Sequence, residues 1–309
     1  MVYDVIIIGA GPSGMTSAIY TKRSGRNVLI IEQGMPGGQA ATTHAIENYP
    51  GFSEPIGGPE LMVKFFEQMM SFGVEMVTAR VDSIDVAGEI KTVKAGDHMY
   101  QTKVLVLASG AQPNVLGVEG EGKYRGKGVS YCATCDGFFF KGKDVVVVGG
   151  GDSALEEAMF LSKICNSVTI VHRRDTFRGA KILQDRVRAA ENITLVMDHV
   201  VEEIKGNNDK ISGLSLKNVK TGEGTELAID GVFIFVGYLP NASYIRPENG
   251  IEQSEIGYLI TDKQLMTNVP GVFVIGDLRV KSLRQVATAV GDGAEVNVAI
   301  EHYLSSEVK

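Results

Sequence analysis

Short runs of apolar, mostly β-branched residues recur along the chain, and segments of helical spacing separate several of them. Uninterrupted apolar runs are typical of strands that are buried on both faces of a sheet. They occupy residues 3–8, 27–31, 103–107, 143–148, 167–171, 231–236 and 272–275. An apolar stripe at helical spacing, which we assign to core packing, comprises Leu61, Met62, Phe65, Phe66, Met69 and Met70. Residues 77–100 have the pattern of a small antiparallel meander, and the alternation elsewhere predicts an α/β fold.

The first apolar run leads directly into a glycine-rich loop, Gly9-Ala10-Gly11-Pro12-Ser13-Gly14. Gly9 allows a tight turn, Gly11 lets a pyrophosphate approach the backbone, and Gly14 lets the following helix lie close to the strand. The next strand ends at Glu32, a carboxylate placed to accept hydrogen bonds from an adenosine ribose. The combination predicts a dinucleotide site, although an empty glycine-rich turn would have the same local pattern.

A second loop of this kind spans residues 149–154 and follows another buried run. The strand after it ends at His172-Arg173-Arg174, with Arg178 a helical turn further on, in the register that Glu32 has in the first motif. Basic groups in place of the acid remove repulsion toward a 2′-phosphate, and guanidinium groups donate charge-assisted hydrogen bonds to it. The second loop therefore predicts NADPH rather than NADH, unless the arginines are only a solvated surface cluster.

A third strand, residues 272–275, ends at Gly276-Asp277 and precedes a helix. The second loop therefore interrupts elements that belong with the first. We expect an α/β fold of two Rossmann-like, three-layer ββα nucleotide-binding domains, the second inserted into the first. Residues 1–113 and 242–309 are expected to form one domain, and residues 114–241 the other, which carries a two-cysteine motif.

That motif is Cys132-Ala133-Thr134-Cys135, followed by Asp136. Its spacing alone suits a redox pair, a structural disulfide or half of a zinc site. A zinc site would also need Cys165 and His172, but Cys165 lies in an apolar helix and is expected to be a buried small hydrophobe. Asp136 is either a proton donor and acceptor for the thiols or a turn residue before a glycine.

Charge and composition narrow the class of protein. The chain has 309 residues, 37 acidic and 30 basic, with a net charge of −7 and no long basic run, which argues against a nucleic-acid partner. It has no apolar stretch of membrane-spanning length and no signal sequence at its start, so we expect a cytoplasmic protein. In that reducing compartment, three cysteines favour chemistry over structural cross-links.

Taken together, the two loops, the Cys132-Ala133-Thr134-Cys135-Asp136-Gly137 segment, the basic strand end and Gly276-Asp277 resemble the low-molecular-weight NADPH-dependent thioredoxin reductases over essentially the full length. The resemblance implies FAD in the discontinuous domain, NADPH in the inserted one, a homodimer, and thioredoxin or a thioredoxin-like protein as partner. Electrons would pass from NADPH through FAD and the Cys132/Cys135 disulfide to the disulfide of thioredoxin. Cys135 would lie nearest the flavin.

The resemblance also assigns residues to each site. The catalytic residues would be Cys132, Cys135 and Asp136. The FAD site would comprise Gly9, Gly11, Pro12, Ser13, Gly14, Glu32, Gln33, Gly38, Gln39, Asn48, Ala108, Ser109, Gly110, Asp277, Arg284, Gln285 and Val286. The NADPH site would comprise Gly149, Gly151, Asp152, Ser153, His172, Arg173, Arg174 and Arg178.

Two other functions share these motifs: a related flavoenzyme that acts on a small dithiol or takes electrons from ferredoxin, and a non-catalytic nucleotide-binding redox sensor. Because the dithiol and NADPH must both reach one flavin, we hypothesise that the inserted domain rotates about residues 112–117 and 237–241. Phe138 and Phe139, with Lys127, form either a docking patch for the acceptor or, in the case of the phenylalanines, part of the core.

Overall fold

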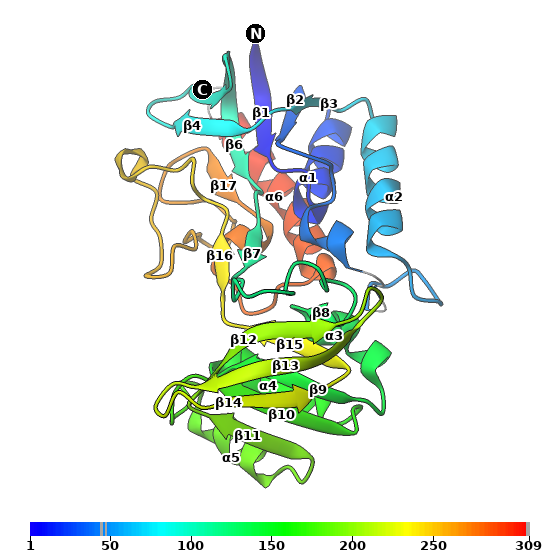
Figure 1. The fold of residues 1–309 in the computed structure, drawn as a ribbon. Helices are drawn as coiled ribbons and strands as arrows, with labels where there is room; N and C mark the ends of the chain where they lie inside the picture. Colours follow the sequence, from blue (N-terminus) through cyan, green and yellow to red (C-terminus); the bar gives the residue numbers. More distant parts are fainter. Residues whose placement is uncertain (44–45, 47, 307–309) are drawn as a thin grey trace. The chain divides into compact units, whose positions relative to one another are not determined.

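The computed structural model describes residues 1–43, 46 and 48–306. Two compact units make up the chain. Unit 1 combines Met1–Thr43, Glu47–Gln112 and Leu239–Lys309, and unit 2 is formed mainly by Pro113–Tyr238. In Figure 1, the blue, cyan and red segments all belong to unit 1, whereas the green segments form unit 2. The chain thus leaves unit 1, builds unit 2 and returns.

Unit 1 is built on a sheet whose parallel part has the order β3-β2-β1-β6-β17. The first half of the long strand β6 also pairs with β5, which pairs with β4, both antiparallel. The strands are β1 (Val2–Ile8), β2 (Val28–Glu32), β3 (Glu75–Thr78), β4 (Val81–Asp85), β5 (Lys91–Ala95), β6 (His98–Leu107) and β17 (Val272–Val274). The helices are α1 (Pro12–Arg23), α2 (Gly58–Ser71) and α6 (Val286–Ser306), with short 3₁₀ turns η1 (Gly38–Thr42), η3 (Pro247–Asn249) and η4 (Gly276–Leu278).

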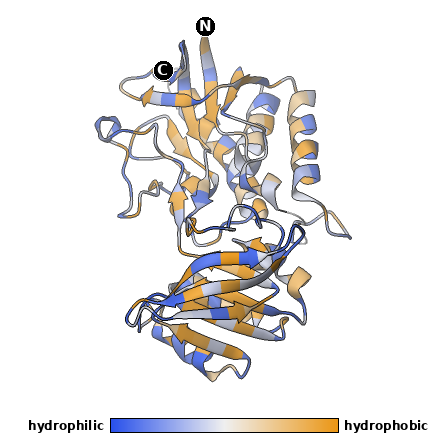
Figure 2. Ribbon diagram, in the orientation of Figure 1, coloured by the Kyte–Doolittle hydropathy of each residue, from blue (hydrophilic) through white to orange (hydrophobic). Residues whose placement is uncertain are grey.

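Both faces of this parallel sheet are buried. Ile6 and Ile8 belong to the same hydrophobic cluster as Leu29, while Val5 and Ile7 are fully buried on the opposite face, because successive side chains in a strand alternate. Figure 2 shows the strands of the parallel sheet of unit 1 largely in the hydrophobic colour. Buried runs were therefore the correct sign of strands, and the predicted α/β class is confirmed.

Two details of the expected pattern are wrong. Residues 77–78 do not begin an antiparallel meander, because β3 follows helix α2 and pairs in parallel with β2, as a helical crossover requires. The stripe on α2 is also narrower than expected. Leu61, Met62 and Met69 are buried, but Met70 is 43% exposed, since it lies about 100° around the helix from Met69.

Unit 2 has three layers. Its central sheet is parallel, with the order β11-β10-β9-β15-β8, and a separate antiparallel sheet has the order β12-β13-β14. The strands are β8 (Val129–Ser130), β9 (Asp144–Gly149), β10 (Ser167–His172), β11 (Ile193–Met197), β12 (His199–Gly206), β13 (Ile211–Asn218), β14 (Gly224–Ala228) and β15 (Gly231–Phe235). The helices are α3 (Ala133–Asp136), α4 (Asp152–Leu161) and α5 (Lys181–Ala189), with the 3₁₀ turn η2 (Gly137–Phe140).

The packing of unit 2 explains these layers. On one face of the central sheet, Val146 packs in a cluster with Ile204 and Leu214 of the antiparallel sheet. On the other face, Val147 packs in a cluster with Leu155 of α4. Strand β9, near the centre of the sheet, is therefore covered on both sides, as expected for the ββα arrangement.

The two connections between the units run as paired strands, β7 (Ala111–Pro113) and β16 (Tyr238–Pro240). The N–H of Asn114 donates to the carbonyl of Gly237 at 2.9 Å, and the N–H of Asn241 donates to the carbonyl of Gly110 at 2.9 Å. In the described part of the chain, no helix is both long enough and apolar enough to cross a membrane.

Candidate active site

The two cysteines of the Cys-x-x-Cys motif are joined in a disulfide, with their Cα atoms 5.3 Å apart. Cys132 has an extended backbone and α3 begins at the next residue, so one helical turn brings Cys135 back to it. Both cysteines are half-buried. The pair is therefore a closed, partly exposed disulfide.

Asp136 is tied to the backbone of the dithiol through one hydroxyl group. The Oγ of Ser130 donates to Asp136 Oδ2 at 2.6 Å, and the N–H of Cys132 donates to the same Oγ at 3.1 Å. Ser130 ends β8 and is buried, which fixes the carboxylate beside the disulfide turn. Ser130 is close to Asp136 in the sequence, but no feature of the Cys-x-x-Cys motif predicts that this serine contacts Asp136.

The residue before the dithiol, Tyr131, is held by Glu121 and by the returning connection. The hydroxyl of Tyr131 donates to Glu121 at 2.8 Å, and Glu121 accepts backbone hydrogen bonds from residues 116 and 117. Burial, and then the Glu121 carboxylate, raise the pKa of Tyr131. From the returning connection, the hydroxyl of Tyr238 donates to the Tyr131 carbonyl at 2.7 Å. The backbone next to Cys132 is thus anchored on two sides.

The remaining cysteine plays no part in this site. Cys165 is free and buried, as predicted, and burial together with Asp144 raises its pKa to about 11. Among the described residues, no three His, Cys, Asp or Glu side chains form a group that could hold a metal ion.

In unit 1, the first glycine loop is shaped as the sequence requires. Gly9 has a φ of +107°, and a Cβ there would lie 2.5 Å from the Ala108 carbonyl oxygen. A Cβ on Gly14 would collide with the carbonyl of Gly9, whereas none of the described atoms lies within 4 Å of a Cβ on Gly11. Helix α1 begins at Pro12, and no described side chain caps it. Open space above free amides fits a pyrophosphate group.

Glu32 is held against this loop. Its carboxylate accepts hydrogen bonds from the N–H of Ala10 at 2.8 Å and the N–H of Gly34 at 3.0 Å. Nearby in sequence, Gln33 is exposed, as are Gly38 and Gln39 in η1. The carboxylate therefore lies at the strand end that the ribose contact requires, with its orientation set by the backbone.

At the third strand end, Asp277 has an unsatisfied atom. Its Oδ1 is buried and has no hydrogen-bond partner among the residues that the structure describes. Burial raises the pKa of Asp277, against the opposing charges of Lys281 and Arg284. A buried acceptor without a donor is unfavourable, and hydroxyl groups of a bound FAD would satisfy it. The residues present thus fit the expected cofactor.

The turn that carries Asp277 is fastened to helix α6. Asp292 on α6 accepts the N–H of Gly276 at 2.9 Å and forms ion pairs with Arg279 and Lys281, each at 2.9 Å. Burial would raise the pKa of Asp292, but the hydrogen bonds from the two cations hold it below its usual range. This network escaped the sequence analysis, although Asp292 follows the buried Ala289 at helical spacing.

Other expected FAD residues of unit 1 fall into two further groups. Asn48 donates through Nδ2 to Gln285 at 3.1 Å, directly before Val286 begins α6. The hydroxyl of Ser109 donates to the carbonyl of Asn241 at 2.7 Å and lies 2.8 Å from the Tyr244 hydroxyl. The hydroxyl of Ser109 is therefore hydrogen-bonded to other residues of this chain. Its neighbours are Ala108, which is buried, and Gly110, which has a φ of +67°.

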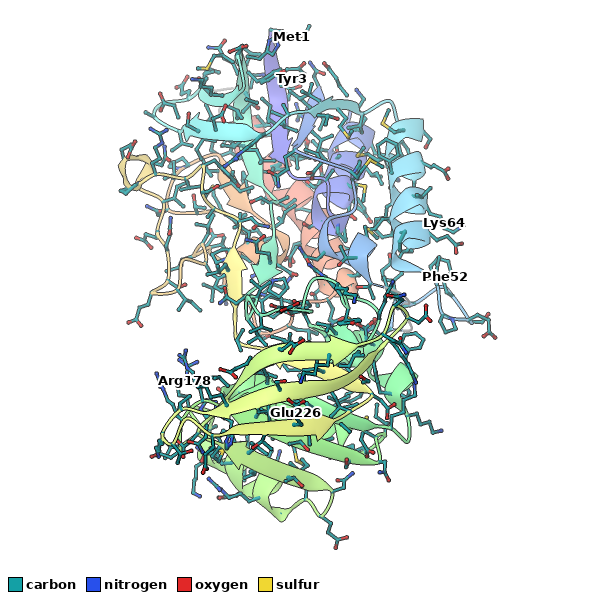
Figure 3. All side chains as sticks on the ribbon, in the orientation of Figure 1. Met1, Tyr3, Phe52, Lys64, Arg178 and Glu226 are labelled. Atoms are coloured by element: carbon teal, nitrogen blue, oxygen red, sulfur yellow. A yellow bond between two sulfur atoms is a disulfide. The ribbon has the colours of Figure 1, made fainter. Side chains whose placement is uncertain are left out.

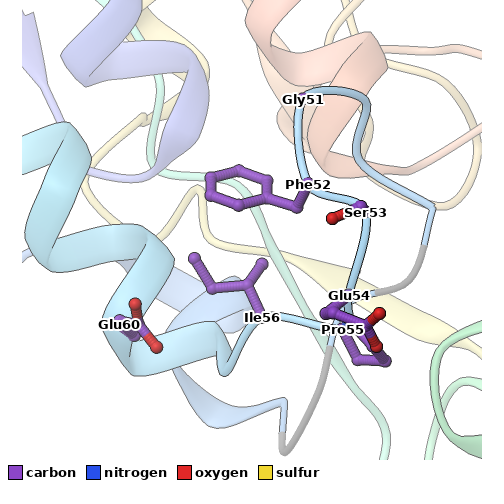
Figure 4. Close-up of a pocket in the computed structure, with 7 residues that line it drawn as sticks. All are labelled: Gly51, Phe52, Ser53, Glu54, Pro55, Ile56 and Glu60. Carbon is purple, nitrogen blue, oxygen red and sulfur yellow. The ribbon is translucent and has the colours of Figure 1, made fainter.

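A separate cavity of about 300 Å³ lies in unit 1 (Figure 4). It is lined by Gly51, Phe52, Ser53, Glu54, Pro55, Ile56 and Glu60. No residue that the sequence assigned to a site lines it.

In unit 2, the second glycine loop repeats the first. A Cβ on Gly149 would lie 2.5 Å from the Phe235 carbonyl oxygen, while none of the described atoms crowds Gly151. Helix α4 begins at Asp152, whose Oδ1 accepts the N–H of Ala180 at 2.6 Å. Ser153 is exposed in the first turn of α4. The loop again presents free space at a helix start.

The basic residues that follow divide into one buried and three exposed side chains. His172 is buried beneath Gly150, and its Nε2–H donates to the Thr176 carbonyl at 3.1 Å. Burial lowers the pKa of His172. Arg173, Arg174 and Arg178 are exposed, and Figure 3 labels Arg178 at the surface of unit 2. The histidine therefore supports the loop, and the arginines are the groups available to a phosphate.

Comparison with known proteins supports the same assignment. The model of the family described as pyridine nucleotide-disulphide oxidoreductase matches residues 3–293. Thioredoxin reductase from Bacillus subtilis (strain 168) is 47% identical over 98% of this chain and 95% of its own length. Its counterpart from Listeria monocytogenes is 45% identical over 98% and 94%.

Solved structures agree. The crystal structure of thioredoxin reductase from Streptococcus pyogenes MGAS5005 is similar with a TM-score of 0.92 and 48% identity, covering 99% of each chain. The chain therefore belongs to the pyridine nucleotide-disulphide oxidoreductase family, and within it to the low-molecular-weight thioredoxin reductases.

Proposed function

We propose that this protein is an NADPH-dependent thioredoxin-disulfide reductase, in which electrons pass from NADPH through FAD to the Cys132–Cys135 disulfide and then to the disulfide of thioredoxin. The observation that carries the proposal is the disulfide itself. Its helix, α3, packs on α4, and α4 is the helix that directly follows the second glycine loop. The similarity to thioredoxin reductases over nearly the whole chain supports the choice of acceptor.

Unit 1, comprising residues 1–113 and 242–309 in the sequence prediction, would hold FAD. Glycines 9, 11 and 14 would admit the pyrophosphate at the start of α1, Glu32 would face the adenosine ribose, and Asp277 would accept hydrogen bonds from hydroxyl groups further along FAD. When bound, FAD supplies a carrier that accepts and passes on two electrons. The protein's own groups orient it.

Unit 2, predicted as residues 114–241, would hold NADPH. The open space at Gly151 suits the pyrophosphate, and the exposed Arg173, Arg174 and Arg178 suit the 2′-phosphate. We assign His172 a supporting role beneath the loop because its ring is buried and hydrogen-bonded.

The dithiol chemistry is a thiol–disulfide exchange. In the reduced pair, the thiolate of one cysteine attacks a sulfur of the thioredoxin disulfide, forming a mixed disulfide and releasing a thioredoxin thiolate. The second cysteine then attacks the mixed disulfide, so that Cys132 and Cys135 are rejoined and thioredoxin leaves as a dithiol. Asp136, held by Ser130, would exchange the protons.

Two exposed phenylalanines support a protein acceptor. Phe138 is 48% exposed and Phe139 is 39% exposed, immediately after the dithiol. The core alternative is therefore wrong for both, and an apolar patch beside a reactive disulfide suits docking of a thioredoxin-like protein. Lys127 is also exposed. We further propose that the protein is cytoplasmic and a homodimer, and sedimentation of the purified protein measures the subunit number.

The test compares the native protein with Cys132→Ser/Cys135→Ser. In both, NADPH is expected to bleach the flavin absorbance. Only the native protein then transfers electrons to oxidised thioredoxin, and Cys165→Ser serves as a control that keeps this activity because Cys165 is buried and free. A colourless protein, bleaching by reduced ferredoxin alone, or anaerobic reoxidation without thioredoxin would overturn the proposal in favour of another function.

A further inference from the structure

Glu157 is a half-buried carboxylate beside the dithiol that no part of the reaction described above uses. It lies on α4, and the backbone N–H of Thr134, between the two cysteines, donates a hydrogen bond to its carboxylate. Its Oε2 is buried and has no hydrogen-bond partner within the described part of the chain. Such burial is unfavourable for a charged carboxylate. The position of Glu157 therefore links it to the Cys-x-x-Cys turn.

Helix α4, which carries Glu157, packs closely against α3 and η2. α3 and η2 pack against α4 so tightly that a Cβ on Gly137 would lie 3.1 Å from both Leu161 and Phe160. Burial, and then repulsion from Glu156, raise the pKa of Glu157 to about 7, while the Thr134 hydrogen bond acts in the opposite direction. Glu157 therefore exchanges its proton near neutral pH.

Other titratable groups lie on α4 itself and on the elements that pack against it, but none of them is a cause of this shift. They are Asp152 on α4, Asp136 on α3, Asp144 on β9, His172 on β10, and Lys181, Asp185, Arg186 and Arg188 on α5. Among the described residues, no cation therefore contributes to the shift in the pKa of Glu157. A new negative charge at the dithiol would act on a carboxylate that is already disfavoured.

We propose that Glu157 is a positioning residue that balances charge at the dithiol, binding a proton when the Cys132–Cys135 disulfide is reduced and releasing it when the disulfide re-forms. This deepens, and rests on, the proposed function, which supplies the electrons from NADPH. Two electrons break the S–S bond. One proton from water goes to one sulfur, the other sulfur remains a thiolate, and a second proton goes to the Glu157 carboxylate, so the net charge of the group is unchanged.

Glu157 acts through its neighbours. It accepts the amide of Thr134, whose Oγ1 lies 3.5 Å from the Cys132 sulfur. A charged carboxylate there repels a thiolate, whereas a neutral carboxyl does not. At a pH above the pKa of Glu157, the charge of its carboxylate makes the disulfide harder to reduce. At a pH below that pKa, the carboxyl is neutral and the effect disappears.

The experiment measures the dithiol–disulfide equilibrium of the purified holoenzyme in glutathione buffers between about pH 5.5 and pH 9. Acid trapping and mass spectrometry report the peptide that contains Cys132 and Cys135. At the low end of this pH range, the equilibrium of Glu157→Gln should match that of the native protein, because the side chain at position 157 is neutral in both. At the high end, the variant should be about 3- to 10-fold more readily reduced. Gln keeps an acceptor for the Thr134 amide.

The matched control is Glu156→Gln, the exposed neighbour. It removes the repulsion but keeps Glu157, so the inflection of the native curve should move to lower pH and persist. A ratio between Glu157→Gln and native that is constant across pH would show a merely structural role and overturn the proposal. If Glu157→Gln does not fold, the native curve still tests the proposal. A native curve without an inflection would overturn the proposal, and so would an inflection that stays at the same pH in Glu156→Gln. Neither NADPH nor thioredoxin is added, so this measurement does not depend on electron transfer from NADPH or to thioredoxin. Failure of the proposed function would instead be seen in the NADPH and thioredoxin assays.

Discussion

At the scale of single residues, the site depends on how each acid is held. Asp136 is bonded to Ser130 at 2.6 Å, Glu32 to two backbone amides, and Asp277 leaves one buried oxygen unsatisfied. These three environments suit three tasks: proton exchange, orientation of a ribose and capture of a ligand hydroxyl.

Asp136→Asn should separate the two halves of the reaction. The amide cannot exchange a proton with the thiols, so we expect thioredoxin reduction to slow about 10²-fold while NADPH still bleaches the flavin at the native rate. Stopped-flow absorbance and a thioredoxin turnover assay measure the two. Ser130→Ala, which keeps the carboxylate but removes its hydrogen bond, should cause a smaller loss. Equal slowing of flavin reduction would argue against this role for Asp136.

Replacing an exposed arginine of the second loop should change the choice of nucleotide. Arg174→Gln and Arg178→Gln each remove a charge-assisted donor, so the KM for NADPH should rise about 10-fold or more for the residue that contacts the 2′-phosphate. The KM for NADH should stay the same. Arg186→Gln, on the exposed side of α5, is the control that should leave both constants unchanged. Parallel losses for NADPH and NADH would contradict a 2′-phosphate contact.

At the scale of elements, the ends of strands are fixed by contacts with distant helices. Asp292 joins α6 to the turn after β17 through Gly276, Arg279 and Lys281. The side chains of Asp292 and Lys281 are only 7% and 6% exposed, so this ion pair is little screened by solvent. The geometry of Asp277 therefore depends on α6.

Asp292→Asn should lower the free energy of unfolding by about 3 kcal/mol, because it leaves two cations near a neutral group. The pKa of Asp292 is lowered in the folded protein, so its contribution is complete above the unfolded value, about pH 4, and is lost as pH falls further through the folded value. Urea titrations should show the variant and the native protein converging at acid pH. Asp185→Asn, which breaks an exposed pair with Lys181, should change stability little. A difference in the free energy of unfolding between Asp292→Asn and the native protein that persists at low pH would contradict this role of the Asp292 charge.

At the scale of the whole molecule, the chain joins its two units by β7 and β16, which are paired by backbone hydrogen bonds on either side of Gln112 and Leu239. The rotation hypothesis requires both connections to twist during turnover. Tyr238 of β16 donates a hydrogen bond to Tyr131, and Glu121 joins Tyr131 to residues 116 and 117, so a twist there would move the backbone next to Cys132.

Cross-linking these connections tests the rotation. In Gln112→Cys/Leu239→Cys, a short bismaleimide can join the new thiols while Cys132 and Cys135 are protected as a disulfide. We expect thioredoxin turnover to fall at least about 10-fold, since the linked strands resist the twist. The single variant Gln112→Cys, treated with a simple maleimide, should keep its turnover. Full activity of the cross-linked protein would rule the rotation out.

Local motifs could be predicted from the sequence because each is decided by neighbouring residues. The loops at Gly9 and Gly149, their helices, the buried strands and the Cys132–Cys135 turn depend on glycine conformation, apolar runs and a three-residue spacing. The antiparallel assignment of residues 77–78 failed because strand pairing joins segments that are distant in the chain.

Only the tertiary structure decided which polar groups meet and which are buried. Ser130 lies beside Asp136 because β8 ends there, Asp292 reaches Gly276 from another element, and Glu157 meets the Thr134 amide because α3 packs on α4. The physical reason is that a charge's pKa and partners are set by burial and by side chains folded against it, which no short pattern encodes. The sequence alone determined the cofactor loops and the sulfur pair, and the fold determined the groups that surround that pair.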